Sequence, residues 1–162
     1  MTESPAVPII GSSCTRRAWL LGCLAVRLPA AVRYRRLRSP TAVPLAQVAD
    51  TWRAASFQAR CSGTALRGML VRTPAGLKAF CLHCPHEICP VNYAEDPRSV
   101  RVESGPPPDH PVFVCPCHFS VFDPLTDGER LSGPAHRGLY RFRLVVRRDR
   151  VEIREVEEEA LP

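Results

Sequence analysis

Residues 84–89 read Cys-Pro-His-Glu-Ile-Cys, and residues 115–118 read Cys-Pro-Cys-His. Each segment places a cysteine close to a histidine, with the spacing C-x-H in the first and C-x-x-H in the second. Thiolate and imidazole groups bind metals together, whereas a scaffold made only of disulfides gives no reason for the histidines. The two segments therefore predict one metal centre held between two loops.

The eight cysteines of the chain are unevenly spread, and five of them lie in the two histidine-containing clusters. Four metal ligands would still leave cysteines for one disulfide. Cys14, Cys23 and Cys61 lie outside the clusters, and the simplest interpretation makes them small, partly buried apolar residues. Zinc is an alternative occupant of the centre, because it binds the same side chains in a tetrahedral set.

The net charge of +6 comes from one end of the chain. Residues 1–40 hold seven arginines and a single acid, Glu3, so the remaining residues carry 15 basic and 15 acidic side chains. A neutral folded part offers no basic groove for phosphates. We therefore expect no nucleic-acid partner.

The N-terminal part contains Arg16 and Arg17 followed by an apolar run, residues 18–26. This pattern resembles a twin-arginine export signal, which implies a location on the outer, periplasmic face of the cytoplasmic membrane. Nine apolar residues are far fewer than the ~20 of a membrane-spanning helix, and a basic arm without export function is the alternative. We divide the chain into a basic segment, the folded domain and an acidic tail: residues 1–40, 41–156 and 157–162.

Two hairpins are predicted in the folded domain. Residues 65–71 and 77–81 are short apolar runs separated by a turn that contains proline and glycine. Hydrophobic and charged residues alternate over residues 140–146 and again at 151–153, as in paired strands with one wet face. The fold class is therefore all-β and antiparallel, with the two ligand loops between the hairpins and a proline-rich exposed excursion at residues 103–111.

The two segments resemble, residue for residue, the ligand loops of the high-potential Rieske iron–sulfur proteins of cytochrome bc complexes, and the small subunit of arsenite oxidase is similar. These loops read C-x-H-x-x-C and C-x-C-H. The resemblance implies one 2Fe-2S cluster with four ligands: Cys84, His86, Cys115 and His118. It also implies a disulfide between the remaining cysteines of the two loops, Cys89 and Cys117. Two neutral histidines in place of two thiolates raise the reduction potential of such a cluster.

A second C-x-H pair, Cys81 and His83, offers a competing register for the first loop. Starting the motif at Cys81 would put His86 where the family has its disulfide cysteine. The register that starts at Cys84 is therefore preferred, and Cys81 and His83 are interpreted as flanking residues.

The resemblance extends beyond the ligands. Residues 119–123 resemble the rest of the family's second loop, and residues 132–135, Ser-Gly-Pro-Ala, resemble the Pro-loop that covers the cluster. It implies an antiparallel Rieske-type β-sandwich with a cluster-binding subdomain, and Ser120 as a hydrogen-bond donor to the cluster. Phe122 replaces a tyrosine that is usual in respiratory members, and the missing hydroxyl should lower the potential. These features, with the two extra cysteines, favour the cluster over zinc.

The function that the resemblance implies is electron transfer in a quinol-oxidising membrane complex. The partners would be cytochrome b and cytochrome c type subunits and quinol, and His118 would be the catalytic residue that accepts a hydrogen bond from quinol. A subunit of an arsenite-oxidase-like molybdenum oxidoreductase is one alternative. A soluble Rieske ferredoxin is the other, although such ferredoxins usually lack the disulfide pair.

Overall fold

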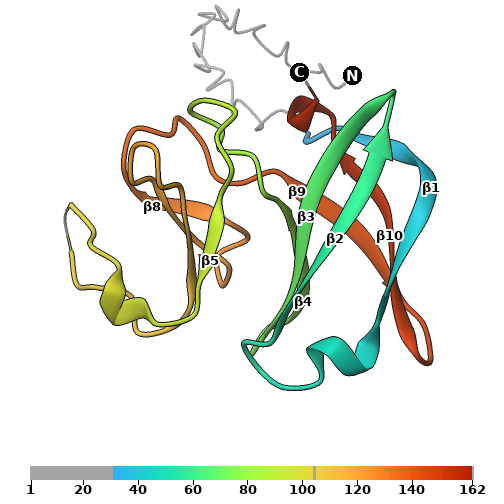
Figure 1. The fold of residues 1–162 in the computed structure, drawn as a ribbon, viewed down its shortest axis with the longest axis horizontal. Coiled ribbons are helices and arrows are strands. Elements are labelled where there is room, and N and C mark those ends of the chain that lie inside the picture. The colour runs from blue at the N-terminus through green and yellow to red at the C-terminus, as the bar shows by residue number, and fades with distance from the viewer. Residues whose placement is uncertain (1–30, 104, 162) are drawn as a thin grey trace, which may run out of the picture. The chain divides into compact units, whose positions relative to one another are not determined.

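The computed structural model describes residues 31–103 and 105–161, and these residues form an all-β structure of two antiparallel sheets (Figure 1). No α-helix occurs within these ranges, and three short 3-10 helices stand at Leu45–Val48, Pro97–Ser99 and Glu158–Ala160. The predicted fold class is confirmed.

The larger sheet has six strands in the order β1-β10-β9-β4-β3-β2. Their bounds are β1 Tyr34–Pro44, β2 Ala54–Cys61, β3 Thr64–Thr73, β4 Gly76–Cys81, β9 Arg141–Val146 and β10 Arg150–Glu157. The two outermost strands also approach each other, because the Thr41 hydroxyl of β1 donates to the Gln58 carbonyl of β2 at 2.9 Å. The sheet therefore curls around its own core.

Both predicted hairpins are present in this sheet. Strands β3 and β4 pair through the expected turn, where the Thr73 hydroxyl donates to the Gly76 carbonyl at 2.9 Å and Gly76 has φ +120°. A side chain would strain that backbone, which explains the glycine. Strands β9 and β10 form the second hairpin, in which the Arg147 amide donates to the Arg150 carbonyl at 2.8 Å.

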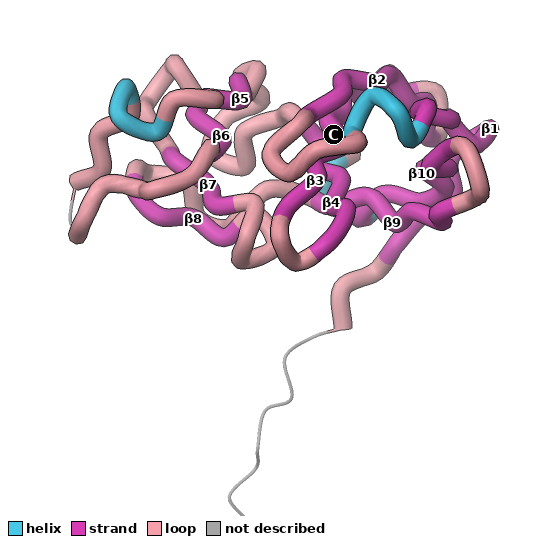
Figure 2. Tube along the Cα trace, turned by 90° about the horizontal axis from the view of Figure 1, so that it is seen from below, coloured by secondary structure: helices cyan, strands magenta, loops and turns pink. Residues whose placement is uncertain are grey.

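The smaller sheet has four short strands in the order β5-β6-β7-β8. Their bounds are β5 Asn92–Ala94, β6 Val112–Val114, β7 Val121–Asp123 and β8 Glu129–Ser132. All four lie between β4 and β9 in the sequence, and the tube view shows them beside the larger sheet (Figure 2). The loops β4–β5 and β6–β7 carry the two cysteine–histidine segments.

Two main hydrophobic cores hold the domain together. The first lies within the larger sheet, where Phe57 of β2 meets Phe142 of β9 edge to face with ring centroids 5.1 Å apart. The second joins the sheets, because Phe80 of β4 packs against Phe113 of β6 at 5.3 Å, and Phe122 is fully buried beside them. The second core therefore fixes the smaller sheet on the larger one.

The ends of the described structure extend the folded domain beyond the boundaries drawn from the sequence. Strand β1 starts at Tyr34, inside the predicted basic segment, and Tyr34 pairs with Glu157. Glu157, placed at the start of the acidic tail, is the last residue of β10 and is buried. The twin arginines and the apolar run lie outside the described residues. Within the described ranges, no helix is long and apolar enough to cross a membrane.

Candidate iron–sulfur site

The first ligand loop, residues 82–91, is closed by its own backbone. The Cys84 amide donates to the Cys89 carbonyl at 2.9 Å, and the Val91 amide donates to the Leu82 carbonyl at 3.0 Å. These bonds turn the chain back on itself after β4. Cys84 is buried at the base of the loop, whereas Glu87 and Ile88 are exposed near its tip.

The second ligand loop, residues 115–120, is a tight turn between β6 and β7. The Cys115 amide donates to the Ser120 carbonyl at 2.8 Å, and the Phe119 amide donates to the Cys115 carbonyl at 2.9 Å. Phe119 has φ +57°, a left-handed conformation that is uncommon for a bulky residue. The turn buries Cys115 and leaves His118 exposed.

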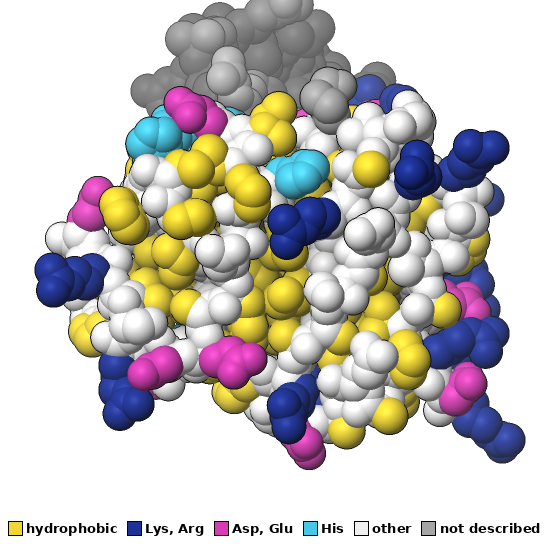
Figure 3. Space-filling view, viewed as in Figure 1, with side chains coloured by type: hydrophobic (Ala, Val, Ile, Leu, Met, Phe, Trp, Pro, Cys, Tyr) yellow, Lys and Arg dark blue, Asp and Glu magenta, His cyan; other side chains and the backbone are white. Residues whose placement is uncertain are grey.

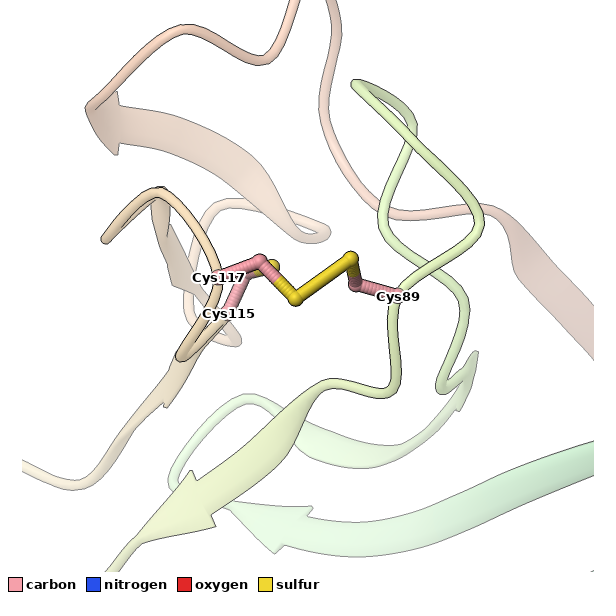
Figure 4. Close-up of side chains that lie close together, drawn as sticks. All are labelled: Cys89, Cys115 and Cys117. Atoms are coloured by element: carbon pink, nitrogen blue, oxygen red, sulfur yellow. A yellow bond between two sulfur atoms is a disulfide. The ribbon is translucent and has the colours of Figure 1, made fainter.

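A disulfide between Cys89 and Cys117 joins the two loops (Figure 4). It links residues 28 positions apart, with Cα atoms at 6.6 Å. The Cys115 sulfur lies beside this bond, because the sulfurs of Cys89, Cys115 and Cys117 are all within 4.8 Å of one another. The structure thus contains the pair that the resemblance implies, and it leaves Cys115 outside the bond.

Cys84 and Cys115 are free, buried thiols that approach each other from the two loops. Burial is the main cause that raises the pKa of the Cys84 thiol, and the neighbouring Cys115 raises it further. Two adjacent thiols without charge compensation favour the neutral form, whereas a bound metal favours thiolates. The pair is therefore suited to hold one metal ion.

His86 and His118, one from each ligand loop, also lie side by side. Their ring centroids are 4.8 Å apart and the rings stand at 88°. The His86 Nδ1 atom is buried and has no hydrogen-bond partner in the described part of the chain. A buried imidazole nitrogen without a partner is costly unless a ligand satisfies it. This donor set, two thiols and two imidazoles, fits the mixed ligation of a Rieske cluster.

The sequence model of the family described as "Rieske [2Fe-2S] domain" matches residues 41–143. This chain belongs to that family. The Rieske domain binds one 2Fe-2S cluster, and the cysteine and histidine groups for it are present in the two loops. No curated protein matches the chain.

The covering loop of this Rieske domain, residues 132–135, packs directly on Ser120. The Ala135 amide donates to the Ser120 hydroxyl oxygen at 3.1 Å, and both residues are buried. Gly133 has φ +86°, and a Cβ added to it would come within 2.5 Å of the Ser120 Cα. Only glycine allows this approach, so the covering loop and the second ligand loop are in close contact.

Phe122 is fully buried in the core that also contains Cys84 and Cys115. A phenyl ring offers no hydrogen-bond donor to a ligand sulfur. Ser120 is the only side chain with a hydroxyl in the second ligand loop, residues 115–120, and it is buried; its role as a donor to the cluster stays a prediction.

Cys81 and His83 occupy different surroundings from the four candidate ligands. Cys81 lies in the core of the larger sheet, and burial raises the pKa of its thiol to about 12. His83 is partly exposed, and burial followed by the nearby Arg67 lowers its pKa. Cys84 belongs to the other core, together with Cys115. Cys81 therefore lies in a different core from Cys115, and the register that starts at Cys84 stays a prediction.

Sequence reasoning missed the side chains that surround the histidines. Ile88 and Phe119 are each 70% exposed, one on each ligand loop, and Figure 3 shows histidine and hydrophobic side chains near one another at the upper end of the view. The Glu87 carboxylate lies 3.9 Å from the His118 Nδ1 atom. The spacing of cysteines and histidines in the family motif identifies only the ligands. It gives no information about the neighbouring residues Glu87, Ile88 and Phe119.

Proposed function

We propose that this Rieske domain is the iron–sulfur subunit of a quinol-oxidising respiratory complex and passes electrons from quinol to a cytochrome c. When bound, the 2Fe-2S cluster supplies one-electron redox chemistry. In this proposal Cys84 and Cys115 hold one iron, and His86 and His118 hold the other. The observation that carries the proposal is the exposed imidazole of His118, on a pair of ligand loops that each also expose one hydrophobic side chain, Ile88 and Phe119.

His118 is the residue proposed to meet the substrate. Its side chain is 46% exposed, whereas the two thiols are buried, so a partner reaches the site from the histidine side. A ring nitrogen that is not bound to metal accepts a hydrogen bond from the hydroxyl of quinol. Ile88 and Phe119 are the exposed hydrophobic side chains of the two loops that an apolar quinol ring or a membrane subunit would contact.

The disulfide between Cys89 and Cys117 supports the proposed location outside the cytoplasm. Disulfides persist in oxidising compartments such as the periplasm and are rare in the cytosol. A folded, cluster-loaded protein exported by the twin-arginine route would then reach the periplasmic face of the cytoplasmic membrane. The same bond counts against a soluble ferredoxin that serves a cytoplasmic oxygenase.

A subunit of a molybdenum oxidoreductase is the second candidate, and Phe122 is compatible with it as well as with the first. Because Phe122 has no hydroxyl, one donor that raises the potential is missing, and a lower potential suits either menaquinol or an arsenite-oxidase-like enzyme. Both candidates use the same site and differ in the subunit that supplies the electrons.

Purification of the protein from membranes of its native host, followed by identification of the bound subunits, separates the candidates. Cytochrome b and cytochrome c subunits, with quinol-dependent reduction of the cytochrome c, are expected. Co-purification with a molybdopterin subunit would replace the first candidate by the second. A monomeric protein found only in the cytoplasm would contradict both.

A further inference from the structure

Glu157 is a buried carboxylate that the proposed electron transfer does not use. Its side chain is 1% exposed at the end of β10. Arg141 donates to it at 2.7 Å, Tyr34 donates to it at 3.3 Å, and Arg137 forms a third contact. A buried charge is retained only where partners compensate for its lost hydration. Of its three partners, Arg137 is the one that lies next to the covering loop in the sequence.

Arg137 follows the covering loop after one residue, and its side chain is held on three sides. It contacts Glu157 and Glu159, and its guanidinium lies over the Tyr140 ring at 4.5 Å from the centroid. An arginine fixed by two carboxylates and an aromatic face has little freedom. The covering loop, residues 132–135, is therefore anchored to the end of β10.

The covering loop in turn orients the Ser120 hydroxyl. The Ala135 amide donates to the Ser120 oxygen, so the hydroxyl hydrogen remains available to donate in another direction. The Ser120 carbonyl accepts from the Cys115 amide, which keeps the hydroxyl on the same turn as a candidate ligand. Glu157 is thus linked to Ser120 through the Arg137 side chain, the backbone of residues 135–137 and the Ala135 amide.

We propose that Glu157 is a positioning residue for the cluster: through Arg137 it anchors the covering loop and keeps the Ser120 hydroxyl directed at the cluster. The proposal requires the Rieske cluster but is independent of the complex that hosts the protein. A donor aimed at the cluster sulfur stabilises the reduced, more negative state. Loss of the anchor therefore lowers the reduction potential.

The test is redox titration of the cluster-loaded Glu157→Gln variant. Glutamine keeps the shape of the side chain and removes the buried one of the two charges that hold Arg137. Glu152→Gln is the matched control, because Glu152 lies on the same strand and pairs with three arginines near the β9–β10 hairpin: Arg147, Arg150 and Arg154. Glu157→Gln should shift the potential downward, and Glu152→Gln should leave it unchanged. Equal shifts in both variants would overturn the proposal.

A double variant with Ser120→Ala tests the route. If Glu157 acts through the Ser120 hydroxyl, Glu157→Gln lowers the potential less than Ser120→Ala does, and it adds nothing in the Ser120→Ala background. A full, additive shift in that background would show that Glu157 does not act through Ser120. Should Glu157→Gln fail to fold, Arg137→Lys tests the same contact from the other side. It should also lower the reduction potential, and it should cause no further shift in the Ser120→Ala background.

Discussion

The imidazole of His110 stacks on the indole of Trp52, with ring centroids 5.1 Å apart and planes 14° from parallel. His110 also lies between two carboxylates, with Nδ1 at 2.7 Å from Asp109 and Nε2 at 2.9 Å from Asp123. Asp123 is the last residue of β7, the strand after the second ligand loop, and Trp52 precedes β2 of the larger sheet. His110 contacts both residues, so it links the smaller sheet to the larger one.

The His110 contacts predict a loss of stability at high pH. Burial alone lowers the pKa of His110, but the hydrogen bonds to Asp109 and Asp123 outweigh it and raise the pKa above its ordinary value. The folded state therefore holds a proton more tightly than the unfolded chain, and the contribution to stability is present below about pH 6.5 and disappears as pH rises through the folded pKa. Urea unfolding should show that His110→Gln destabilises the protein more at about pH 6 than at about pH 9.

His136→Gln serves as the control for this pH trend, because His136 is exposed and forms no ion pair among the described residues. Because the side chain is exposed, its effect on unfolding should be small. An equal cost of His110→Gln at both pH values would contradict the charged state of His110.

The disulfide should contribute to the stability of both loops. Replacing Cys89 and Cys117 together by serine should lower the free energy of unfolding by roughly 2–4 kcal/mol, because the bond restricts the unfolded chain. Chemical denaturation measures the change, and a reductant should have no further effect on the double variant. Peptide mapping of the cluster-bearing protein that finds both thiols free would contradict the bond.

The cluster assignment predicts two irons and two acid-labile sulfides per chain, with the EPR spectrum of mixed histidine and cysteine ligation in the reduced state. Cys84→Ser or His118→Ala should abolish the cluster, because each removes a ligand. Cys81→Ser and His83→Gln should retain it. Stoichiometric zinc in protein matured in the native host, or loss of the cluster in the Cys81 variant alone, would reverse the assignment.

Phe122→Tyr should raise the reduction potential, and Ser120→Ala should lower it, because both change the donors available to the ligand sulfurs. A charge-assisted hydrogen bond of ~1.5–3 kcal/mol corresponds to a one-electron shift of roughly 65–130 mV as an upper range. Phe122 is fully buried, so the added hydroxyl must find room inside the core, and the spectrum of the variant should be checked for an intact cluster. An unchanged potential in Ser120→Ala would contradict the role of Ser120.

The ligand loops and two hairpins could be predicted from the sequence because their signals are local. Metal-ligand spacing spans a few residues, and the turn at residues 73–76 and the alternation in β9 need no knowledge of distant partners. Strands β5, β6 and β7 have three residues each, too few to show a period. They could not be predicted for that reason.

The burial of Glu157 shows a different limit of sequence reasoning. In the sequence it belongs to an acidic run that suggests a frayed tail, and Tyr34 belongs to an arginine-rich segment. In the structure the two residues pair across β1 and β10, and Arg137 and Arg141 compensate the carboxylate. The residues that compensate the buried charge of Glu157 are far from it along the chain, so a local sequence pattern cannot predict that Glu157 is buried.

Strands β4 and β9 are neighbours in the larger sheet, with Ala79 opposite Phe142 and Phe80 opposite Arg141. The chain therefore leaves that sheet after Cys81 and re-enters it at Arg141 in almost the same place. The metal-binding part is an insertion between two adjacent strands, and its length can change without altering the register of any strand pair in the larger sheet. A graft of this module between other adjacent antiparallel strands would have to bring the larger sheet's half of the second core with it, because Phe80 and Val71 pack against the module.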